Sequence, residues 1–183
     1  MRISSGALKG VALKSPPKNV RPTGERTRQV LFSVLGDRVR GARFLDLYAG
    51  SGVVGLEAIS RGAAEAVFVE SSPKVYRVLL ENIERCGVGD KARPILAKAE
   101  KALRRLAKGE ERFEVIFLDP PYRLWGAEAG RILPLLPSVL AEGGVAVAQR
   151  PKKSALPLPE GLEVADERDL GETLLTFVFA PRL

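Results

Sequence analysis

Residues Asp46–Gly52 read DLYAGSG and directly follow the apolar residues Phe44 and Leu45. A strand that turns into a helix through closely spaced glycines is typical of the ligand-binding turns of doubly wound sheets. Gly50 and Gly52 permit a tight turn and a close approach to a ligand, because neither carries a Cβ atom. Gly55 falls at the third glycine position of the dinucleotide fingerprint. Taken alone, the segment is only a weak indication of cofactor binding.

An acidic residue, Glu70, lies about twenty positions downstream, at the end of the next expected strand. A carboxylate at this place typically accepts hydrogen bonds from ribose hydroxyls. Ala99 and Glu100 follow the third expected strand, where an adenine edge could be contacted; helix capping by Glu100 is the alternative. The predicted cofactor-binding residues are Asp46, Tyr48, Ala49, Gly50, Ser51, Gly52, Glu70, Ser71 and Ala99.

A second loop, Asp119–Tyr122, reads DPPY and ends the fourth expected strand. Pro120 and Pro121 lack N–H groups and have a fixed φ, so they stiffen a stretch of backbone whose carbonyls are exposed. A carboxylate and a fixed carbonyl can accept both hydrogens of an exocyclic amine, which frees its lone pair to attack a methyl group. Tyr122 would stack on a planar substrate. Trp125 is either part of a lid or a packing residue. The predicted catalytic residues are Asp119, Pro120, Pro121 and Tyr122.

Apolar runs and amphipathic segments alternate from residue 42 onward. This pattern predicts repeated β-α units and a parallel sheet covered on both faces. Two late apolar stretches lie close enough to pair as antiparallel strands. The expected strands are residues 43–47, 66–70, 93–97, 113–119, 144–149, 161–166 and 173–180. The expected helices are residues 26–35, 53–61, 73–86, 100–108 and 127–141, the last interrupted near its prolines.

Composition limits the possible chemistry. The chain has 183 residues and 45% hydrophobic content, which suits one domain with a small appendage. No apolar run approaches the ~20 residues that a membrane span needs, and the N-terminus lacks a signal-peptide core. One cysteine, Cys86, predicts a cytoplasmic protein without internal disulfides. The absence of histidine excludes a Ser-His-Asp triad and a His-ligated metal, so we expect no metal site.

The positive charge is concentrated near the N-terminus. The net charge is +7, and residues 1–43 contain ten basic and two acidic residues, a balance of +8. The rest of the chain holds 19 basic and 20 acidic residues. A near-neutral body with a basic N-terminal segment indicates a polyanionic partner such as nucleic acid, although a generally basic surface would give the same numbers.

Together these motifs resemble those of the bacterial 16S ribosomal RNA guanine-N2 methyltransferases, the family that modifies guanine 966 in ribosomal RNA numbering. The resemblance covers nearly the whole chain. It rests on Arg2, Ile3, Gly6, Lys9 and Gly10, on Arg21–Thr23 with Arg26, Leu31 and Phe32, on Asp46–Gly52 with Gly55, Glu57 and Ala58, on Arg61–Ala63, Glu70 and Asp119–Tyr122, and on Gly171–Thr173. Adenine-N6, guanine-N2 and protein-glutamine methyltransferases all share the Asp-Pro-Pro-Tyr tetrapeptide. The Arg-Pro-Thr segment is much more specific.

This resemblance implies an α/β, Rossmann-like fold with a seven-stranded, mostly parallel sheet whose last strand pair is antiparallel. It implies S-adenosylmethionine as cofactor and small-subunit 16S rRNA as partner, inside an assembling subunit. A monomer is the default expectation for the oligomeric state. Residues 1–41 would form a basic hairpin-and-helix extension, and residues 42–183 the methyltransferase domain. The predicted RNA-binding residues beside the active site are Arg21, Thr23, Arg26 and Arg28.

Three other functions remain open. A DNA adenine-N6 methyltransferase would share both loops, but it usually needs a target-recognition domain for which 183 residues leave no obvious room. The basic N-terminal segment argues against a protein-glutamine methyltransferase. The intact Asp119–Tyr122 loop argues against a non-catalytic RNA-binding assembly factor that keeps a methyltransferase fold.

Overall fold

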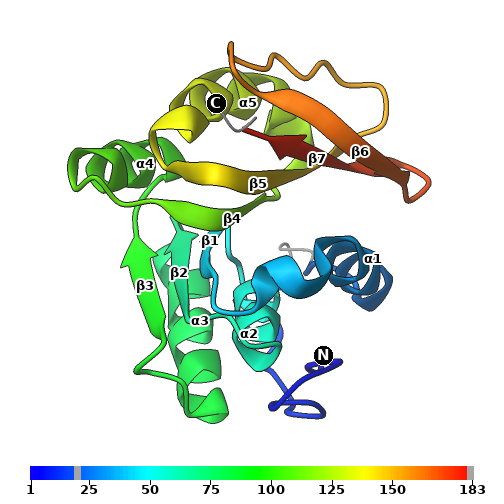
Figure 1. Cartoon of the computed structure of the whole chain (residues 1–183). Helices are drawn as coiled ribbons and strands as arrows, with labels where there is room; N and C mark the ends of the chain where they lie inside the picture. Colours follow the sequence, from blue (N-terminus) through cyan, green and yellow to red (C-terminus); the bar gives the residue numbers. More distant parts are fainter. Residues whose placement is uncertain (19–21, 181–183) are drawn as a thin grey trace.

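The computed structural model describes residues 1–18 and 22–180, which form a three-layer α/β fold (Figure 1). A seven-stranded sheet with the order β3-β2-β1-β4-β5-β7-β6 forms the middle layer. β7 runs antiparallel to both β5 and β6, and the remaining neighbours pair in parallel. The strands are β1 (Arg43–Leu47), β2 (Glu65–Glu70), β3 (Ala92–Leu96), β4 (Phe113–Leu118), β5 (Leu140–Pro151), β6 (Glu163–Asp169) and β7 (Thr173–Phe179). The predicted Rossmann-like fold is confirmed.

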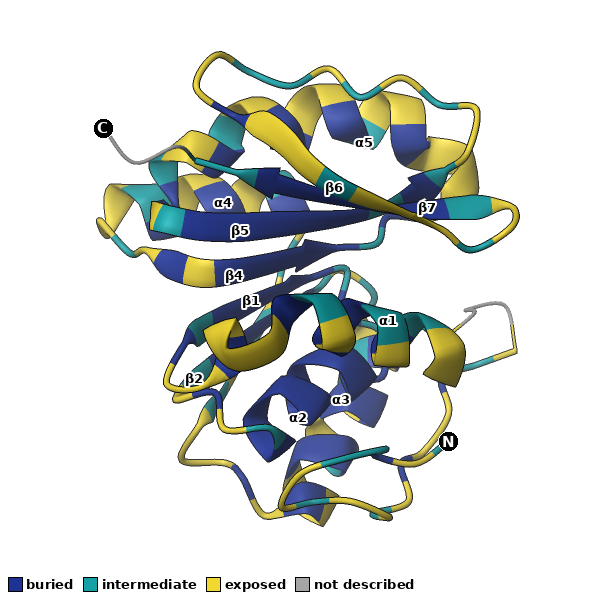
Figure 2. Ribbon diagram, turned by 45° about the vertical axis from the view of Figure 1, so that its right-hand side comes forward, coloured by how far each residue is buried: buried dark blue, intermediate teal, exposed yellow. Residues whose placement is uncertain are grey.

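Helices cover both faces of the sheet, because successive residues of a strand point to opposite sides. On β1, Phe44 belongs to the core shared with α1, α2 and α3, whereas Leu45 belongs to the core shared with α4 and α5. Figure 2 shows that α2 is buried along its whole length. The α-helices are α1 (Glu25–Leu35), α2 (Val53–Ser60), α3 (Pro73–Cys86), α4 (Ala99–Lys108) and α5 (Trp125–Ile132), and the 3-10 helices are η1 (Gly36–Val39), η2 (Tyr122–Leu124) and η3 (Leu133–Ser138).

The strand order reverses at β1, which lies between β2 and β4. Such a reversal leaves a crevice at the carboxyl ends of the strands, where doubly wound sheets bind their ligands. Leu47 pairs with Val69 on β2 and with Leu118 on β4. The glycine turn after β1 therefore lies between Glu70 and Asp119, each of which follows one of these pairs in the sequence.

The first residues of the chain pack against the rest of the fold. Ile3 and Leu13 are buried in the core that α1 and α2 share. The predicted hairpin is short: one antiparallel bridge joins Arg2 to Ala12, the Ile3 N–H donates to the Val11 carbonyl at 3.1 Å, and the Leu13 N–H donates to the Met1 carbonyl at 2.9 Å. Its turn also bonds to α2, where the Ala7 N–H donates to the carbonyl of Ser60, the last residue of that helix. Residues 1–13 thus contribute to the core as well as to the surface charge. The domain boundary after residue 41 stays a prediction.

The expected helix over residues 127–141 is wrong in its bounds. α5 starts at Trp125 and ends at Ile132, η3 follows, and β5 already begins at Leu140. Pro134 and Pro137 explain the difference, because proline removes a hydrogen-bond donor and clashes with the preceding turn of an α-helix. Among the helices that the structure describes, none is long and apolar enough to cross a membrane.

Candidate active site

The turn after β1 takes a shape that favours glycine. Tyr48, Gly50 and Gly52 have positive φ angles of 60°, 58° and 83°. A Cβ atom on Gly52 would lie 2.4 Å from the Cδ1 atom of Leu79, so a side chain there would push against α3. At Gly50 the space that a Cβ atom would take is open. The turn is therefore packed against the protein at Gly52 and accessible to a ligand at Gly50.

Two other residues of the turn hold its backbone in place. Ala49 and Ser51 are both buried. The Ala49 N–H donates to the carbonyl of Val69 at 2.8 Å, and the Ser51 carbonyl accepts a hydrogen bond from the side-chain amide of Asn82 at 2.9 Å. These contacts fix the turn to β2 and α3, so Ala49 and Ser51 support the turn from the protein interior.

The Glu70 carboxylate reaches the turn from the end of β2. One of its oxygens accepts a hydrogen bond from the Gly50 N–H at 3.0 Å, and the other accepts one from the Ser72 N–H at 2.8 Å. Ser71, between them, is exposed. The carboxylate is thus held at the entrance of the crevice, at the position expected for accepting hydrogen bonds from ribose hydroxyls.

A cavity of about 270 Å³ opens beside this carboxylate. The end of β2, the residues after β3 and the start of α4 line one side of it. Pro121 and Leu124, together with residues of α5, line the other side. It brings together four of the predicted cofactor-binding residues and one of the predicted catalytic residues: Tyr48, Glu70, Ser71, Ala99 and Pro121. The cavity is therefore the place where the two predicted loops meet.

Asp46 lies beneath the turn and is 1% exposed. Its Oδ2 atom accepts a hydrogen bond from the Gly55 N–H at 3.0 Å, which fixes the first turn of α2. Burial raises the pKa of the Asp46 carboxyl to about 8; the Gly55 hydrogen bond opposes this shift, and the charges of Asp119 and Glu70 add to it. A cation bound in the crevice would favour the ionised form of this carboxyl.

The predicted catalytic loop, Asp119–Tyr122, begins directly after β4. Asp119 is half-buried, and its Oδ2 atom accepts a hydrogen bond from the Thr23 hydroxyl at 3.2 Å. Pro120 is buried and Pro121 is exposed. Tyr122 opens η2 with 60% of its surface exposed, so its ring is accessible from outside the fold. The loop thus presents a carboxylate and an accessible ring beside the cofactor turn.

The structure decides between the two roles considered for Trp125. Its side chain is 3% exposed and belongs to the core under α4 and α5. The indole N–H donates to the carbonyl of Ala155 at 2.8 Å. Trp125 is therefore a packing residue, and the lid hypothesis for it is wrong.

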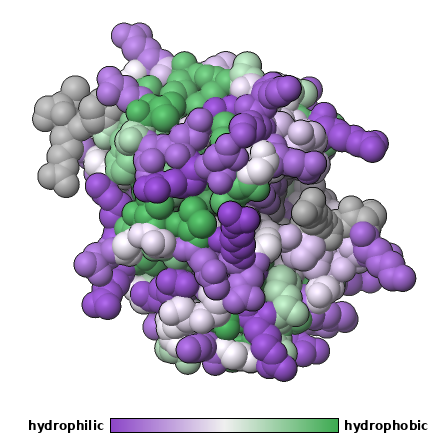
Figure 3. All heavy atoms as spheres, turned by 90° about the vertical axis from the view of Figure 1, so that its right-hand side faces the viewer, coloured by the Kyte–Doolittle hydropathy of each residue, from purple (hydrophilic) through white to green (hydrophobic). Residues whose placement is uncertain are grey.

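The four predicted RNA-binding residues lie in different environments. Arg21 falls outside the described residues. Arg26 is exposed on α1. On the face of the molecule turned toward the viewer in Figure 3, hydrophilic side chains surround smaller apolar areas. The Thr23 hydroxyl donates a hydrogen bond to the Asp119 carboxylate. Arg28 is 2% exposed, and its Nε and Nη atoms donate to Glu57 and to two backbone carbonyls. The prediction for Arg28 is therefore wrong, because a buried and fully bonded guanidinium is not available to RNA.

Sequence reasoning missed the contribution of α5 to the site. Glu128 and Arg131 line the 270 Å³ cavity, and Glu128 accepts a hydrogen bond from the hydroxyl of Tyr48. Burial, followed by this contact, raises the pKa of the Tyr48 hydroxyl above its usual range. Polar residues on an amphipathic helix are normally solvent-exposed, so the sequence carried no signal that distinguished these two.

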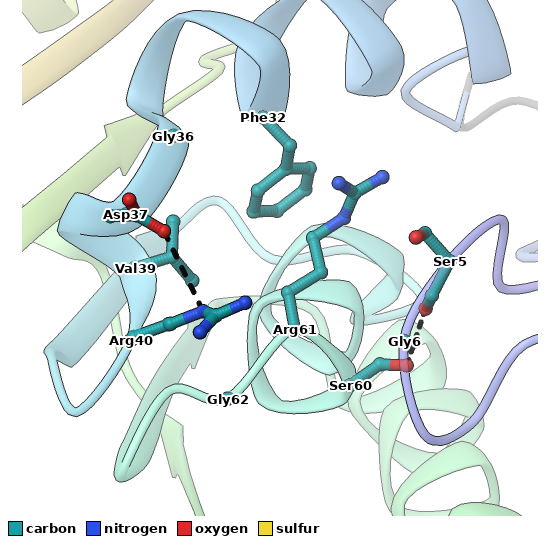
Figure 4. Close-up of a pocket in the computed structure, with 10 residues that line it drawn as sticks. All are labelled: Ser5, Gly6, Phe32, Gly36, Asp37, Val39, Arg40, Ser60, Arg61 and Gly62. Carbon is teal, nitrogen blue, oxygen red and sulfur yellow. Dashed lines mark hydrogen bonds and ion pairs between the residues drawn. The ribbon is translucent and has the colours of Figure 1, made fainter.

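A larger cavity, of about 700 Å³, lies at the other end of α2 and contains none of the predicted site residues. Figure 4 shows its walls. Asp37 comes from η1, Arg40 follows that helix, the Phe32 ring comes from α1, and Ser60 and Arg61 lie at the end of α2. The guanidinium carbon of Arg61 lies 4.7 Å from the centre of the Phe32 ring. This cavity is separate from the two loops, which meet at the start of α2.

Comparisons with known proteins agree with this geometry. The model of the family described as Conserved hypothetical protein 95 matches residues 1–179. The chain belongs to this family. It is 36% identical over 160 residues to the Bacillus subtilis (strain 168) protein named "Putative rRNA methyltransferase YlbH", covering 86% of each chain. It is also 36% identical over 124 residues to Ribosomal RNA small subunit methyltransferase D of Escherichia coli (strain K12), covering 67% of this chain and 61% of that protein.

A solved structure supports the fold. The structure titled "Putative methyltransferase yhhF from Escherichia coli" superposes with a TM-score of 0.86 and 29% identity, over 100% of this chain and 99% of that one. The family resemblance inferred from the sequence is confirmed by these matches, and so is the methyltransferase fold.

Proposed function

We propose that this protein transfers a methyl group from S-adenosylmethionine to the exocyclic N2 amine of a guanine in 16S rRNA of the small ribosomal subunit. One observation carries the proposal: the turn after β1 and the Asp119–Tyr122 loop lie side by side, at the carboxyl ends of two paired strands. A methyl donor and a planar amine held by these loops would be adjacent. The family membership and the names of the relatives support the same reaction.

The residues around the 270 Å³ cavity fit the proposed cofactor. Glu70 offers carboxylate oxygens at the end of β2, Gly50 leaves open space, and Ala99 starts α4 at the cavity wall. S-adenosylmethionine supplies an electrophilic methyl group on a positively charged sulfur. The carboxylates of Glu70 and Asp119 suit this charge, and a cation between them would counteract the burial and the two neighbouring charges that raise the pKa of Asp46.

Asp119 and the Pro120 carbonyl would act on the guanine amine. Both are hydrogen-bond acceptors, and the flanking prolines hold the backbone stiff. Accepting both amino hydrogens favours a pyramidal nitrogen whose lone pair points at the methyl group, so the gain comes from positioning and electrostatics. After transfer, Asp119 or water takes the proton that the nitrogen loses.

Tyr122 would stack on the guanine, which must be unpaired or flipped out to reach the crevice. Replacing Tyr122 by alanine should raise KM for the RNA by roughly five- to 150-fold, since stacking on one base contributes about 1–3 kcal/mol. Tyr122→Phe keeps the ring and should stay within about twofold of the wild type. Steady-state kinetics with 16S rRNA measures both. Equal KM values for Tyr122→Ala and the wild type would rule out stacking.

The basic residues of α1 and of the segment before it would contact the RNA backbone. Arg26, exposed near the start of α1, should lose one phosphate contact when changed to glutamine. The slope of log affinity against log salt should then fall by about 0.7–0.9, while affinity for S-adenosylmethionine is unchanged. Lys108→Gln, at the exposed end of α4 under the opposite face of the sheet, is the matched control. Equal slopes for Arg26→Gln and Lys108→Gln would contradict this contact.

Truncation would be a poor test of the same contact. Removal of residues 1–23 also removes the buried side chains of Ile3 and Leu13, so the fold would be weakened together with RNA binding. Single substitutions of exposed basic residues avoid this loss. We further propose that the enzyme acts in the cytoplasm as a monomer on rRNA inside an assembling small subunit.

The decisive experiment is methyl transfer from radiolabelled S-adenosylmethionine to three substrates, followed by nucleoside analysis. The substrates are small subunits that lack the modification, naked 16S rRNA, and DNA. N2-methylguanosine in rRNA is the expected product, and the better rRNA form shows whether ribosomal proteins present the base. Label in DNA as N6-methyladenine would favour the DNA methyltransferase alternative. RNA binding without any transfer would favour the non-catalytic assembly factor.

A further inference from the structure

Thr23 is the point at which the N-terminal segment meets the catalytic loop. Its hydroxyl donates a hydrogen bond to Oδ2 of Asp119 at 3.2 Å, across 96 positions of sequence. Thr23 lies two residues before the start of α1, and its side chain is half-buried. The contact therefore depends on where the N-terminal segment is held.

A buried arginine holds Thr23 in this place. Nη1 of Arg28, in the first half of α1, donates to the Thr23 carbonyl at 2.7 Å. Nε of Arg28 lies 2.9 Å from Oε2 of Glu57, and the two side chains are 3% and 0% exposed. An ion pair that is almost fully buried has little freedom to move, because separating its members would leave an unpaired charge in the interior.

Glu57 anchors this pair to α2. Its other oxygen accepts hydrogen bonds from the Ser4 hydroxyl and from Nη2 of Arg61, the latter at 3.1 Å. α2 starts at the glycine turn, where Asp46 bonds to the Gly55 N–H. The pair from Arg28 to Glu57 thus connects the segment that carries Thr23 to the helix that starts at the cofactor turn. Figure 2 shows α1 lying beside α2.

We propose that Thr23 is a positioning residue of the methyl-transfer site: its hydroxyl orients the Asp119 carboxylate toward the amine, and the Arg28–Glu57 pair holds Thr23 in register. This inference rests on the proposed function. It replaces the expectation that Thr23 contacts RNA. A carboxylate that can rotate presents its lone pairs in several directions, and small errors in the placement of a reacting group lower the turnover rate steeply. The N-terminal segment is therefore a part of the active site.

The test compares Thr23→Val, which removes the hydroxyl at nearly constant shape, with Thr23→Ser, which keeps it. Single-turnover and steady-state kinetics on 16S rRNA measure kcat and KM, and melting curves report the fold. We expect Thr23→Val and Thr23→Ala to lower kcat by roughly ten- to a hundredfold, with KM for RNA and affinity for S-adenosylmethionine within about twofold of the wild type. Thr23→Ser should recover kcat to within about threefold.

Thr27→Val is the matched control, because Thr27 lies one turn further along and its side chain is equally half-buried. It should leave kcat unchanged. A kcat of Thr23→Val and Thr23→Ala close to that of the wild type would overturn the proposal, as would equal losses in Thr23→Ser and Thr23→Val. A raised KM with normal kcat would overturn it too and make Thr23 an RNA contact. Failure of the wild type to form N2-methylguanosine contradicts the proposed function instead.

Discussion

Replacing Asp119 by alanine should lower kcat for methyl transfer by about a hundred- to ten-thousandfold, the range typical of a lost group that handles protons in a transition state. The acceptor for the amino hydrogens disappears, while the contacts of Glu70 with Gly50 and Ser72 remain. Affinity for S-adenosylmethionine, measured by calorimetry, should therefore stay within about threefold. Asp119→Asn should be nearly as slow, because the asparagine side chain replaces one of the two acceptor oxygens of the carboxylate by an NH2 donor.

Asp90→Ala is the control for this substitution, because Asp90 is an exposed carboxylate in the loop before β3. It should leave kcat unchanged. Asp119→Ala also removes a charge that helps to raise the pKa of Asp46, so that pKa should fall in the variant. Wild-type turnover in Asp119→Ala would show that the loop only shapes the crevice and that the acceptor lies elsewhere.

Breaking the buried ion pair should give the largest loss of stability. Glu57→Gln leaves the charge of Arg28 without its partner at 3% exposure, and such a change typically costs about 3–5 kcal/mol of unfolding free energy. Urea denaturation, with the midpoint and slope fitted together, measures the loss. Glu81→Gln is the matched control: Glu81 pairs with Lys14 at 2.7 Å, but the two side chains are 45% and 48% exposed, so the expected cost is below about 1 kcal/mol.

A double substitution separates the lost pair from other effects. Arg28→Met with Glu57→Leu removes both charges of the buried pair and should be less destabilised than Glu57→Gln, because the one charge that still loses its partner, on Arg61, has a side chain that is 25% exposed. If Glu57→Gln costs no more than Glu81→Gln, the Arg28 charge is neutralised by its backbone contacts alone, and the pair does not hold the N-terminal segment.

The sheet and both loops were predictable because their signals are local. The DLYAGSG turn, Glu70 and the DPPY loop each follow an apolar run, and parallel strands bring such ends together at one edge. The register of Leu47 with Leu118 then places the loops side by side. This part of the site follows from the order of the strands and from the alternation of side chains between the two faces of the sheet.

The burial of Arg28 was missed because charge composition does not report burial. Arg28 was counted as a surface cation, yet its partner Glu57 lies 29 positions further along the chain. A signal did exist. Glu57 is the only charged residue within the sequence VVGLEAIS, and a carboxylate in an apolar helix requires a buried cation. No such signal distinguished Glu128 and Arg131, because polar residues are common on the exposed face of an amphipathic helix such as α5.

The long sequence distances of these contacts set an order of assembly. Synthesis proceeds from the N-terminus, so the first thirty residues leave the ribosome well before their partners do. Arg28 can be neutralised only after residue 57 has been made, and Thr23 finds its acceptor only after residue 119. Until then the first 43 residues, whose charges balance to +8, lack these partners. During translation, therefore, this basic segment is made first, and the contact between Thr23 and Asp119 is the last of these to form.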